Sequence, residues 1–330
     1  MITADFKPLS LTQSVTQWAN CPMEIIYHQP VLTDEVIQGL NVLPGGTYID
    51  CTTGQGGHTE AILLKCKPAG TVLALDMDPD AINSAHSRLK PYMDNLILSQ
   101  INYTELDVVH EKSSLSHING ILFDLGLSSF QLESSDRGFS FRRDEPLDMR
   151  FDPLGNFTAY DIVNGYKEKD LEELLFWYGE EPRARTIARR IVKNRPITTA
   201  RMLASLVEQA YKSSRRRIHP ATKTFQAIRM VVNNELKNIA IGLAKAISVL
   251  GPGGRLVVIS YHSLEDRIVK QFFRTESRDC ICPIETLICS CKHLAKLRLV
   301  NKRIITPSPM EKAINPRSRS ARMRIAEVIR

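Results

Sequence analysis

The chain has 330 residues, of which 43% are hydrophobic and 24% are charged, which is ordinary for a globular protein that buries a substantial core. No apolar run approaches the ~20 residues that span a bilayer, and residues 1–22 lack the basic start and apolar middle of a signal peptide. We therefore expect a cytoplasmic protein with no membrane partner. The seven cysteines are an odd number, which favours a reducing compartment over a disulfide framework.

The net charge of +7 is concentrated in one segment. From Arg183 to Arg229 the sequence has 13 lysines and arginines but one acid, Glu208, so this segment carries +12 and the rest of the chain −5. Such a segment is typical of a surface that contacts a nucleic-acid backbone. The alternative is a pair of helices whose basic outer faces are simply solvated.

Helix-like and strand-like segments alternate from residue 23 onward, after a polar stretch at 1–22 that we expect to be a poorly ordered extension. The alternation predicts a doubly wound, mostly parallel sheet covered by helices on both faces, a Rossmann-like α/β fold. In chain order, the predicted elements are a helix at 32–39, a strand at 47–51, a helix at 59–65, a strand at 71–76, a helix at 80–89, and strands at 96–100 and 120–125.

The alternation stops near Ser134 and resumes near residue 219. We therefore expect a discontinuous core, residues 23–134 and 219–330, interrupted by a helical insertion at 135–218. The predicted helices of the insertion are 170–178, 183–193 and 200–212. The core then continues with a helix at 222–250, a strand at 255–260 and a helix after His262.

The sequence TYIDCTTGQGGHTE at 47–60 places a glycine cluster between a predicted strand and a predicted helix. It is not a phosphate-binding P-loop, because His58 stands where that loop needs a lysine. It matches the dinucleotide fingerprint only in part, because Thr59 occupies the third glycine position. A third interpretation is a loop that lets S-adenosylmethionine lie against bare backbone, as in class I methyltransferases.

Carboxylates stand at the carboxyl ends of two later strands, where open parallel sheets bind ligands. Asp76 ends the second strand, where a carboxylate can accept hydrogen bonds from both hydroxyls of a ribose. Asp78 suits the N-cap of the next helix. Asp124 ends the fourth strand. An acceptor there could hold the N–H bonds of a poorly nucleophilic exocyclic amine and align it with a sulfonium methyl group. The alternative is that Asp124 only bonds backbone amides in the turn that follows.

Eight segments of the chain, in order, resemble the signature blocks of the bacterial 16S ribosomal RNA cytosine-N4 methyltransferases, the MraW-like family. They are DCTTGQGGHT, LDMDP, DLGLSS, DRGFSF, PLDMRFD, HPATKTFQAIR, SYHSLEDR and INPRSRS, and the resemblance covers about residues 23–330. The resemblance implies methyl transfer from S-adenosylmethionine to N4 of a cytosine in the decoding region of 16S rRNA, within the small ribosomal subunit. It also implies a Rossmann-like core whose helical insertion contacts the RNA. The oligomeric state stays open.

The resemblance further implies roles for individual residues. Cofactor contacts would come from the glycine loop, the ribose carboxylate, an aromatic ring beside the adenine and residues near the methionine end: Gly56, Gly57, His58, Asp76, Tyr103, Asp124 and Gln131. The catalytic candidates are Asp124, Ser128 and Ser129. Cys51 and Thr53 depart from the family's pattern, but neither departure removes a polar contact.

RNA contacts are predicted in the loop DRGFSFRRDEPLDMR and in the two blocks near residues 219–229 and 260–267. Phe139 and Phe141 either stack on an unpaired base or anchor the insertion to the core. Ser263 with Asp266 reads as a helix capping box. The candidates for a cytosine pocket are Ser260, Tyr261 and His262. The RNA-binding candidates are Arg137, Arg142, Arg143, Arg150, Lys223, Arg229 and His262.

A cysteine cluster follows the last predicted helix. Cys280, Cys282, Cys289 and Cys291 form two C-x-C pairs six residues apart, with His293 close behind. Four thiolates could bind a structural zinc ion tetrahedrally. The usual zinc spacing is wider, with two or more residues between paired cysteines, so the alternative is a loop with a purely local structural role.

Three other functions remain open at this point. A nicotinamide oxidoreductase would share the fold and Asp76, although Thr59 argues against it. A ribosome-assembly factor would bind S-adenosylmethionine only structurally. A DNA amino-methyltransferase has the nearest chemistry, but the Pro-Pro-aromatic turn that usually follows its acid is missing after Asp124.

Overall fold

The computed structural model of the chain describes residues 29–133, 136–211, 219–283, 285–286 and 289–330. The expected N-terminal extension at 1–22 lies outside these residues. None of the helices within them combines the length and the apolarity that crossing a bilayer requires.

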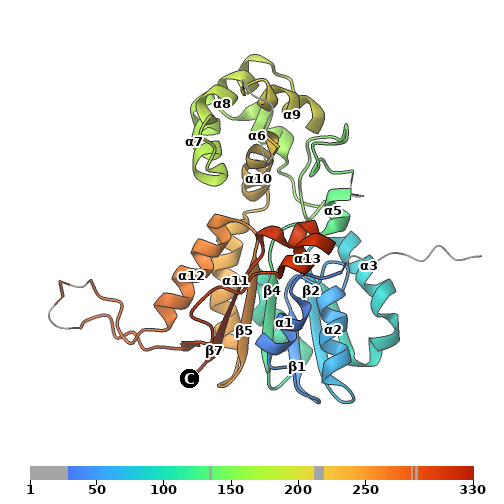
Figure 1. Cartoon of the computed structure of the whole chain (residues 1–330), viewed down its shortest axis with the longest axis vertical. Helices are drawn as coiled ribbons and strands as arrows, with labels where there is room; N and C mark the ends of the chain where they lie inside the picture. The colour runs from blue at the N-terminus through green and yellow to red at the C-terminus, as the bar shows by residue number, and fades with distance from the viewer. Residues whose placement is uncertain (1–28, 134–135, 212–218, 284, 287–288) are drawn as a thin grey trace, which may run out of the picture.

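A seven-stranded sheet with the order β3-β2-β1-β4-β5-β7-β6 forms the centre of the lower half of the molecule (Figure 1). β1 to β5 run parallel, and β7 pairs antiparallel with both β5 and β6. The sheet confirms the predicted Rossmann-like fold, to which β7 and β6 add two further strands beyond β5 at one edge. The strands are β1 (Thr47–Asp50), β2 (Thr71–Asp76), β3 (Leu96–Gln100), β4 (Gly120–Asp124), β5 (Arg255–Ser260), β6 (Leu297–Leu299) and β7 (Arg322–Val328).

Helices cover both faces of the sheet. Successive residues of each strand point to opposite faces, so the apolar strands need helices on both sides to be buried. Tyr48 and Val72 pack with α1, α2 and α3 on one face, and Ile49 and Leu73 pack with α4, α11 and α12 on the other. These helices are α1 (Thr33–Gly39), α2 (Gly57–Cys66), α3 (Pro79–Leu89), α4 (Leu106–Ser113), α11 (Glu235–Val249) and α12 (Ser263–Glu276). Shorter helical turns are η1 (Lys90–Asn95), η2 (Tyr103–Glu105), α5 (Ser129–Glu133), α13 (Pro309–Ile314) and η3 (Pro316–Ser320).

Among the described residues, the helices α6 to α10 form the upper part of the molecule in Figure 1. Their buried cluster runs from Phe139 to Val232 and includes Phe225 and Ile228 of α10. α10, which the sequence assigned to the core, therefore packs with the helices of the expected insertion at 135–218. The boundaries of that insertion stay a prediction. The helices are α6 (Ala159–Gly165), α7 (Glu168–Gly179), α8 (Ala184–Lys193), α9 (Ala200–Glu208) and α10 (Ala221–Val232).

The prediction of one continuous helix at 222–250 is wrong. α10 ends at Val232, and α11 begins at Glu235 after Asn234, whose φ of +51° is left-handed and interrupts the helix. The side chain of Asn233 donates to the carbonyl of Met149 at 2.7 Å and accepts the backbone N–H of Phe151 at 2.7 Å. The break therefore ties the end of α10 to the loop that precedes α6.

Candidate active site

A cavity of about 460 Å³ lies at the carboxyl ends of β1, β2 and β4, within the size range of small-molecule sites. β1 and β4 are neighbours at the point where the strand order reverses, which is where open α/β sheets bind ligands. The loops of the sheet line one side of the cavity. Aromatic side chains of the helical part line the other side: Phe139, Phe141, Phe151 and Phe225.

The glycine loop between β1 and α2 uses backbone conformations that favour glycine. Gly54 has a φ of +53° and donates its N–H to the carboxylate of Asp76 at 2.9 Å. Gly56 has a φ of +82°, and a Cβ atom at this position would lie 3.0 Å from the side chain of Leu89. Gly54 and Gly57 line the cavity, whereas Gly56 makes the turn into α2.

Thr59, which departs from the dinucleotide fingerprint, connects the start of α2 to the end of β1. Its hydroxyl donates to the carboxylate of Asp50 at 2.7 Å, and the same carboxylate accepts the N–H of Thr52 at 3.1 Å. Asp50 is fully buried, and burial raises its pKa. Asp50 was not predicted as a site residue. It is the last residue of β1, and nothing in the local sequence indicates that Thr59 of α2 bonds to its carboxylate.

Asp76 and Asp78 follow β2 and have different tasks. Asp76 accepts the N–H of Asp78 at 3.0 Å in addition to the glycine-loop contact, and burial raises its pKa to about 6. The prediction that Asp78 caps α3 is confirmed, because its side chain accepts the N–H of Asp80 at 3.1 Å. Its second oxygen accepts bonds from Gln131 at 2.8 Å and Arg137 at 2.6 Å. Gln131 thus lines the cavity while its side-chain amide is hydrogen-bonded to Asp78.

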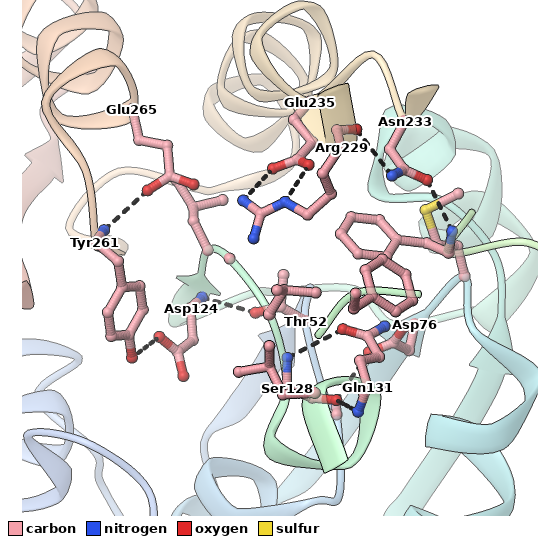
Figure 2. Close-up of a pocket in the computed structure, with 18 of the residues that line it drawn as sticks. Thr52, Asp76, Asp124, Ser128, Gln131, Arg229, Asn233, Glu235, Tyr261 and Glu265 are labelled. Atoms are coloured by element: carbon pink, nitrogen blue, oxygen red, sulfur yellow. Dashed lines mark hydrogen bonds and ion pairs between the residues drawn. The ribbon is translucent and has the colours of Figure 1, made fainter. Parts of the chain in front are cut away.

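Asp124 is held at the end of β4 by neighbours from three segments (Figure 2). Its N–H donates to the hydroxyl of Thr52 at 2.7 Å, and its Oδ1 accepts the hydroxyl of Tyr261 at 2.8 Å. Oδ2 lies 3.4 Å from Nε2 of His58. Burial, together with the nearby charge of Asp124, raises the pKa of Tyr261 well above its usual value. Tyr261 therefore stays protonated, and its hydroxyl donates a hydrogen bond to the carboxylate of Asp124.

The other residues predicted at the cofactor site lie beside this group. Tyr103 begins η2 and lines the cavity, where its ring meets Phe123 edge to face with centroids 5.3 Å apart. Ser128 stabilises the turn, because its Oγ accepts the N–H of Gln131 at 3.2 Å. Ser129 begins α5, and its side chain lies outside what the structure describes.

Two buried carboxylates form the roof of the cavity (Figure 2). Glu235 accepts two hydrogen bonds from the guanidinium of Arg229, at 2.7 and 2.8 Å. Glu265 accepts the N–H of Tyr261 at 2.8 Å and lies 3.0 Å from Nε2 of His262. Burial acts to raise the pKa of Glu265, but the hydrogen bonds of His262 and Tyr261 and the charges of His262 and Arg229 together outweigh burial, so this pKa lies below its usual value. Neither carboxylate was predicted from the sequence.

The predicted capping box of Ser263 with Asp266 is wrong by one residue. His262 is the N-cap of α12: its Nδ1 accepts the N–H of Glu265 at 3.4 Å, and the Glu265 carboxylate accepts the N–H of His262 at 3.3 Å. Asp266 instead accepts a hydrogen bond from Arg324 at 2.7 Å. His262 is thus fixed by the start of its helix at the margin of the cavity.

Most cations predicted to bind RNA have partners inside the protein. Arg142 is exposed. The others are Arg137 with Asp78, Arg143 with Glu145, Arg150 with Asp148, Lys223 with the carbonyl of Glu180, Arg229 with Glu235 and His262 with Glu265. RNA binding by these residues stays a prediction, and a phosphate at any of the paired cations would share that cation with a group of the protein.

The two phenylalanines of the loop before α6 pack within the helical part. Phe139 is buried and stacks on Phe151, with ring centroids 5.6 Å apart. Phe141 stacks on His219 at 4.1 Å. These contacts favour the anchoring interpretation over base stacking, although both rings also line the cavity.

Comparisons with known proteins agree with this geometry. The family model described as the MraW methylase family matches residues 25–329. A ribosomal RNA small subunit methyltransferase H of Dehalococcoides mccartyi is 52% identical over 302 residues, which cover 92% of this chain and 86% of the relative. Proteins of the same name from Thermomicrobium roseum and a Paenibacillus species are 50% and 45% identical, over 92% and 91% of this chain and 94% and 98% of the relatives. The chain therefore belongs to the MraW methylase family.

Proposed function

We propose that the protein transfers a methyl group from S-adenosylmethionine to the exocyclic N4 of a cytosine in the decoding region of 16S ribosomal RNA. Membership of a methylase family and the names of the curated relatives support an rRNA methyltransferase. The observation that carries the choice of an amine is Asp124, whose partly exposed carboxylate lines the cavity and accepts a hydrogen bond from Tyr261, while its backbone N–H is bound to Thr52.

The cavity fits S-adenosylmethionine, which supplies an electrophilic methyl group when it is bound. His58 is buried, and its Nδ1 has no hydrogen-bond partner among the described residues, whereas its Nε2 lies 3.4 Å from Oδ2 of Asp124. Because a buried polar atom without a partner is costly, a polar ligand in the cavity would stabilise this arrangement. Asp76 would hold the ribose, Tyr103 would flank the adenine, and the backbone of the glycine loop would contact the rest of the cofactor.

Asp124 would position the amine. The lone pair of an exocyclic amine is delocalised into its ring, so acceptors that hold the N–H bonds help to localise it. Tyr261 occupies Oδ1 of Asp124, which fixes the carboxylate and leaves Oδ2 to accept an N–H of the base. Thr52 fixes the backbone of the same residue. The aromatic wall of the helical part would exclude water from this side of the cavity.

The direct test is to incubate the protein with methyl-labelled S-adenosylmethionine and unmethylated small ribosomal subunits, digest the RNA and identify the labelled nucleoside by mass spectrometry. We expect the label in N4-methylcytidine, at a cytosine of the decoding region. Label in another nucleoside would overturn the choice of N4, and label elsewhere in 16S rRNA would overturn the choice of region. Absence of label from both subunits and free rRNA would favour an assembly factor.

Binding of S-adenosylmethionine is expected to weaken as the pH falls through about 6, the raised pKa of Asp76. Below this pH the protonated carboxyl is favoured, and it cannot accept both ribose hydroxyls; the loss of affinity should approach about tenfold per pH unit. Calorimetric titration between pH 8 and pH 5 measures this change. The non-titrating variant Asp76→Asn should bind weakly across the range. Constant wild-type affinity through pH 6 would contradict the ribose role.

The exposed basic face of α8 is expected to bind the RNA backbone. Arg185, Arg189 and Lys193 are exposed and recur every four residues, so they share one face of the helix. In the double variant Arg185→Gln/Lys193→Gln, the plot of log affinity for the subunit against log salt should become shallower by about 1 for each cation removed. Filter binding at several salt concentrations measures this slope.

The matched control removes the same charge from the sheet part, in the variant Lys65→Gln/Lys90→Gln, at two exposed positions. Its salt dependence should equal that of the wild type. Equal slopes for all three proteins would show that the α8 face is merely solvated.

A further inference from the structure

The connection between α12 and β6 is a loop without a core of its own. Residues 277–296 contain no helix or strand in the part that the structure describes, and the loop extends away from the body of the molecule (Figure 1). Its base is closed by the N–H of Lys296, which donates to the carbonyl of Glu276 at 2.8 Å. Ile281 and Leu294 are 47% and 57% exposed. Loops of this length without secondary structure are uncommon in compact domains and are usually functional, disordered or linkers.

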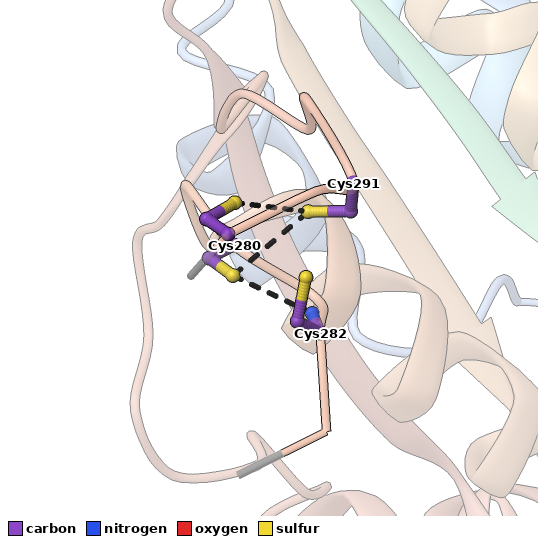
Figure 3. Close-up of side chains that lie close together, drawn as sticks. Cys280, Cys282 and Cys291 are labelled. Carbon is purple, nitrogen blue, oxygen red and sulfur yellow. Dashed lines mark hydrogen bonds between the residues drawn. The ribbon is translucent and has the colours of Figure 1, made fainter. Parts of the chain in front are cut away.

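The four cysteines of the loop have converged into one cluster. Their Sγ atoms all lie within 4.8 Å of one another, and Figure 3 shows the sulfur atoms of Cys280, Cys282 and Cys291 turned toward the same point. Sγ of Cys291 is 3.6 Å from that of Cys289 and 3.8 Å from that of Cys280. A tetrahedral zinc site with Zn–S bonds of about 2.3 Å places its sulfur atoms about 3.8 Å apart. These two separations therefore match the edges of such a tetrahedron.

The surroundings of the sulfur atoms also suit thiolate ligands. The N–H of Ile281 points to Sγ of Cys291 at 3.4 Å, and the N–H of Cys282 points to Sγ of Cys280 at 3.4 Å. Backbone N–H groups directed at metal-bound sulfur are a common outer shell, because they stabilise the negative charge. Nε2 of His293 lies 3.1 Å from the carbonyl of Thr275, so this imidazole is engaged away from the cluster.

We propose that Cys280, Cys282, Cys289 and Cys291 bind one zinc ion as a tetrathiolate site that orders the connection between α12 and β6. Each C-x-C pair lies on a different arm of the loop, so the ion would cross-link the two arms. This arrangement explains why a spacing shorter than the usual zinc motif suffices: the ligands of one pair need not turn the chain around the metal alone. An all-sulfur donor set favours zinc or an iron–sulfur cluster over harder divalent ions.

The test uses the full chain, purified under reducing conditions, with metal content measured by mass spectrometry. We expect one zinc per chain in the wild type and in Ser290→Ala, which alters the same loop but keeps all four thiols. Cys282→Ser/Cys291→Ser should lose the zinc. Replacement of zinc by cobalt(II) should give the intense visible absorption of a tetrahedral tetrathiolate in the first two proteins only.

A second measurement does not depend on the folding of a variant. Removal of zinc from the wild type by a chelator should accelerate tryptic cleavage after the exposed residues Arg278 and Lys292, and added zinc should restore protection. Protein that contains no zinc as purified and takes up none when zinc is added would overturn the proposal. So would disulfides among these cysteines in alkylated, non-reduced digests, or stoichiometric iron with inorganic sulfide.

Discussion

Replacing Asp124 by Asn is expected to lower the single-turnover rate of methyl transfer by about 10²- to 10³-fold, the range found when a group that stabilises a transition state is removed. Affinity for S-adenosylmethionine should fall much less. The amide keeps the shape of the side chain, but a bound Asn can present an N–H where the N–H of the base needs an acceptor. Rates are measured at saturating cofactor with small ribosomal subunits, and affinity is measured by calorimetry.

Two further variants make this experiment specific. Tyr261→Phe removes the hydroxyl that fixes Oδ1 of Asp124 but leaves the carboxylate, so a smaller loss of about tenfold is expected. Asp107→Asn changes a carboxylate on α4 that is paired with Lys245 outside the cavity, and it should react at the wild-type rate. If Asp124→Asn also reacts at that rate, Asp124 has only a structural role in the turn after β4.

The parts of the fold that were predictable from sequence depend on local patterns. The predicted strands agree with the structure to within one residue, because β1 to β5 are short apolar runs bounded by turn residues. The cap formed by Asp78 was predictable for the same reason, since it acts on a residue two positions along the chain. Glycines at positive φ likewise followed from the need for a tight turn after β1.

The errors arose where a distant contact decides a local structure. The apolar spacing of residues 222–250 continues past Asn233 and Asn234, so the pattern predicts one helix although asparagine is a residue that can end helices. The break depends on Asn233 bonding Met149 and Phe151, which are more than 80 residues away in sequence. Arg229 was predicted to bind RNA, because its burial against Glu235 depends on the break between α10 and α11.

The candidate site shows the same division. Asp76, Asp124 and the glycine loop were identified because the ends of parallel strands converge by topology. The orienting contacts were not, because Tyr261 reaches Asp124 from 137 positions away. Tyr261 was considered as a pocket residue, but its hydrogen bond to the carboxylate could only be seen once β5 was placed beside β4.

The buried pair of Arg229 and Glu235 should dominate the stability of the junction between α10 and α11. Both residues are less than 10% exposed, and two hydrogen bonds join their side chains. Glu235→Leu leaves a buried guanidinium without its carboxylate, so the free energy of unfolding should fall by about 3–5 kcal/mol. Lys169→Ala breaks the exposed pair of Lys169 with Glu173 and should cost less than about 1 kcal/mol. Urea unfolding of the full chain compares the two.

The double variant Arg229→Met/Glu235→Leu separates stability from RNA binding. Replacing both partners by apolar side chains removes the unpaired charge, so most of the stability lost in Glu235→Leu should return. If the free energy of unfolding of the double variant stays as low as that of Glu235→Leu, the pair stabilises the protein through contacts around the cavity and not through its charges. Because the double variant lacks Arg229, its affinity for small ribosomal subunits also tests that residue as a phosphate contact. We expect unchanged affinity, because Arg229 is buried and paired with Glu235. A shallower salt dependence of binding would instead indicate that Arg229 contacts the RNA.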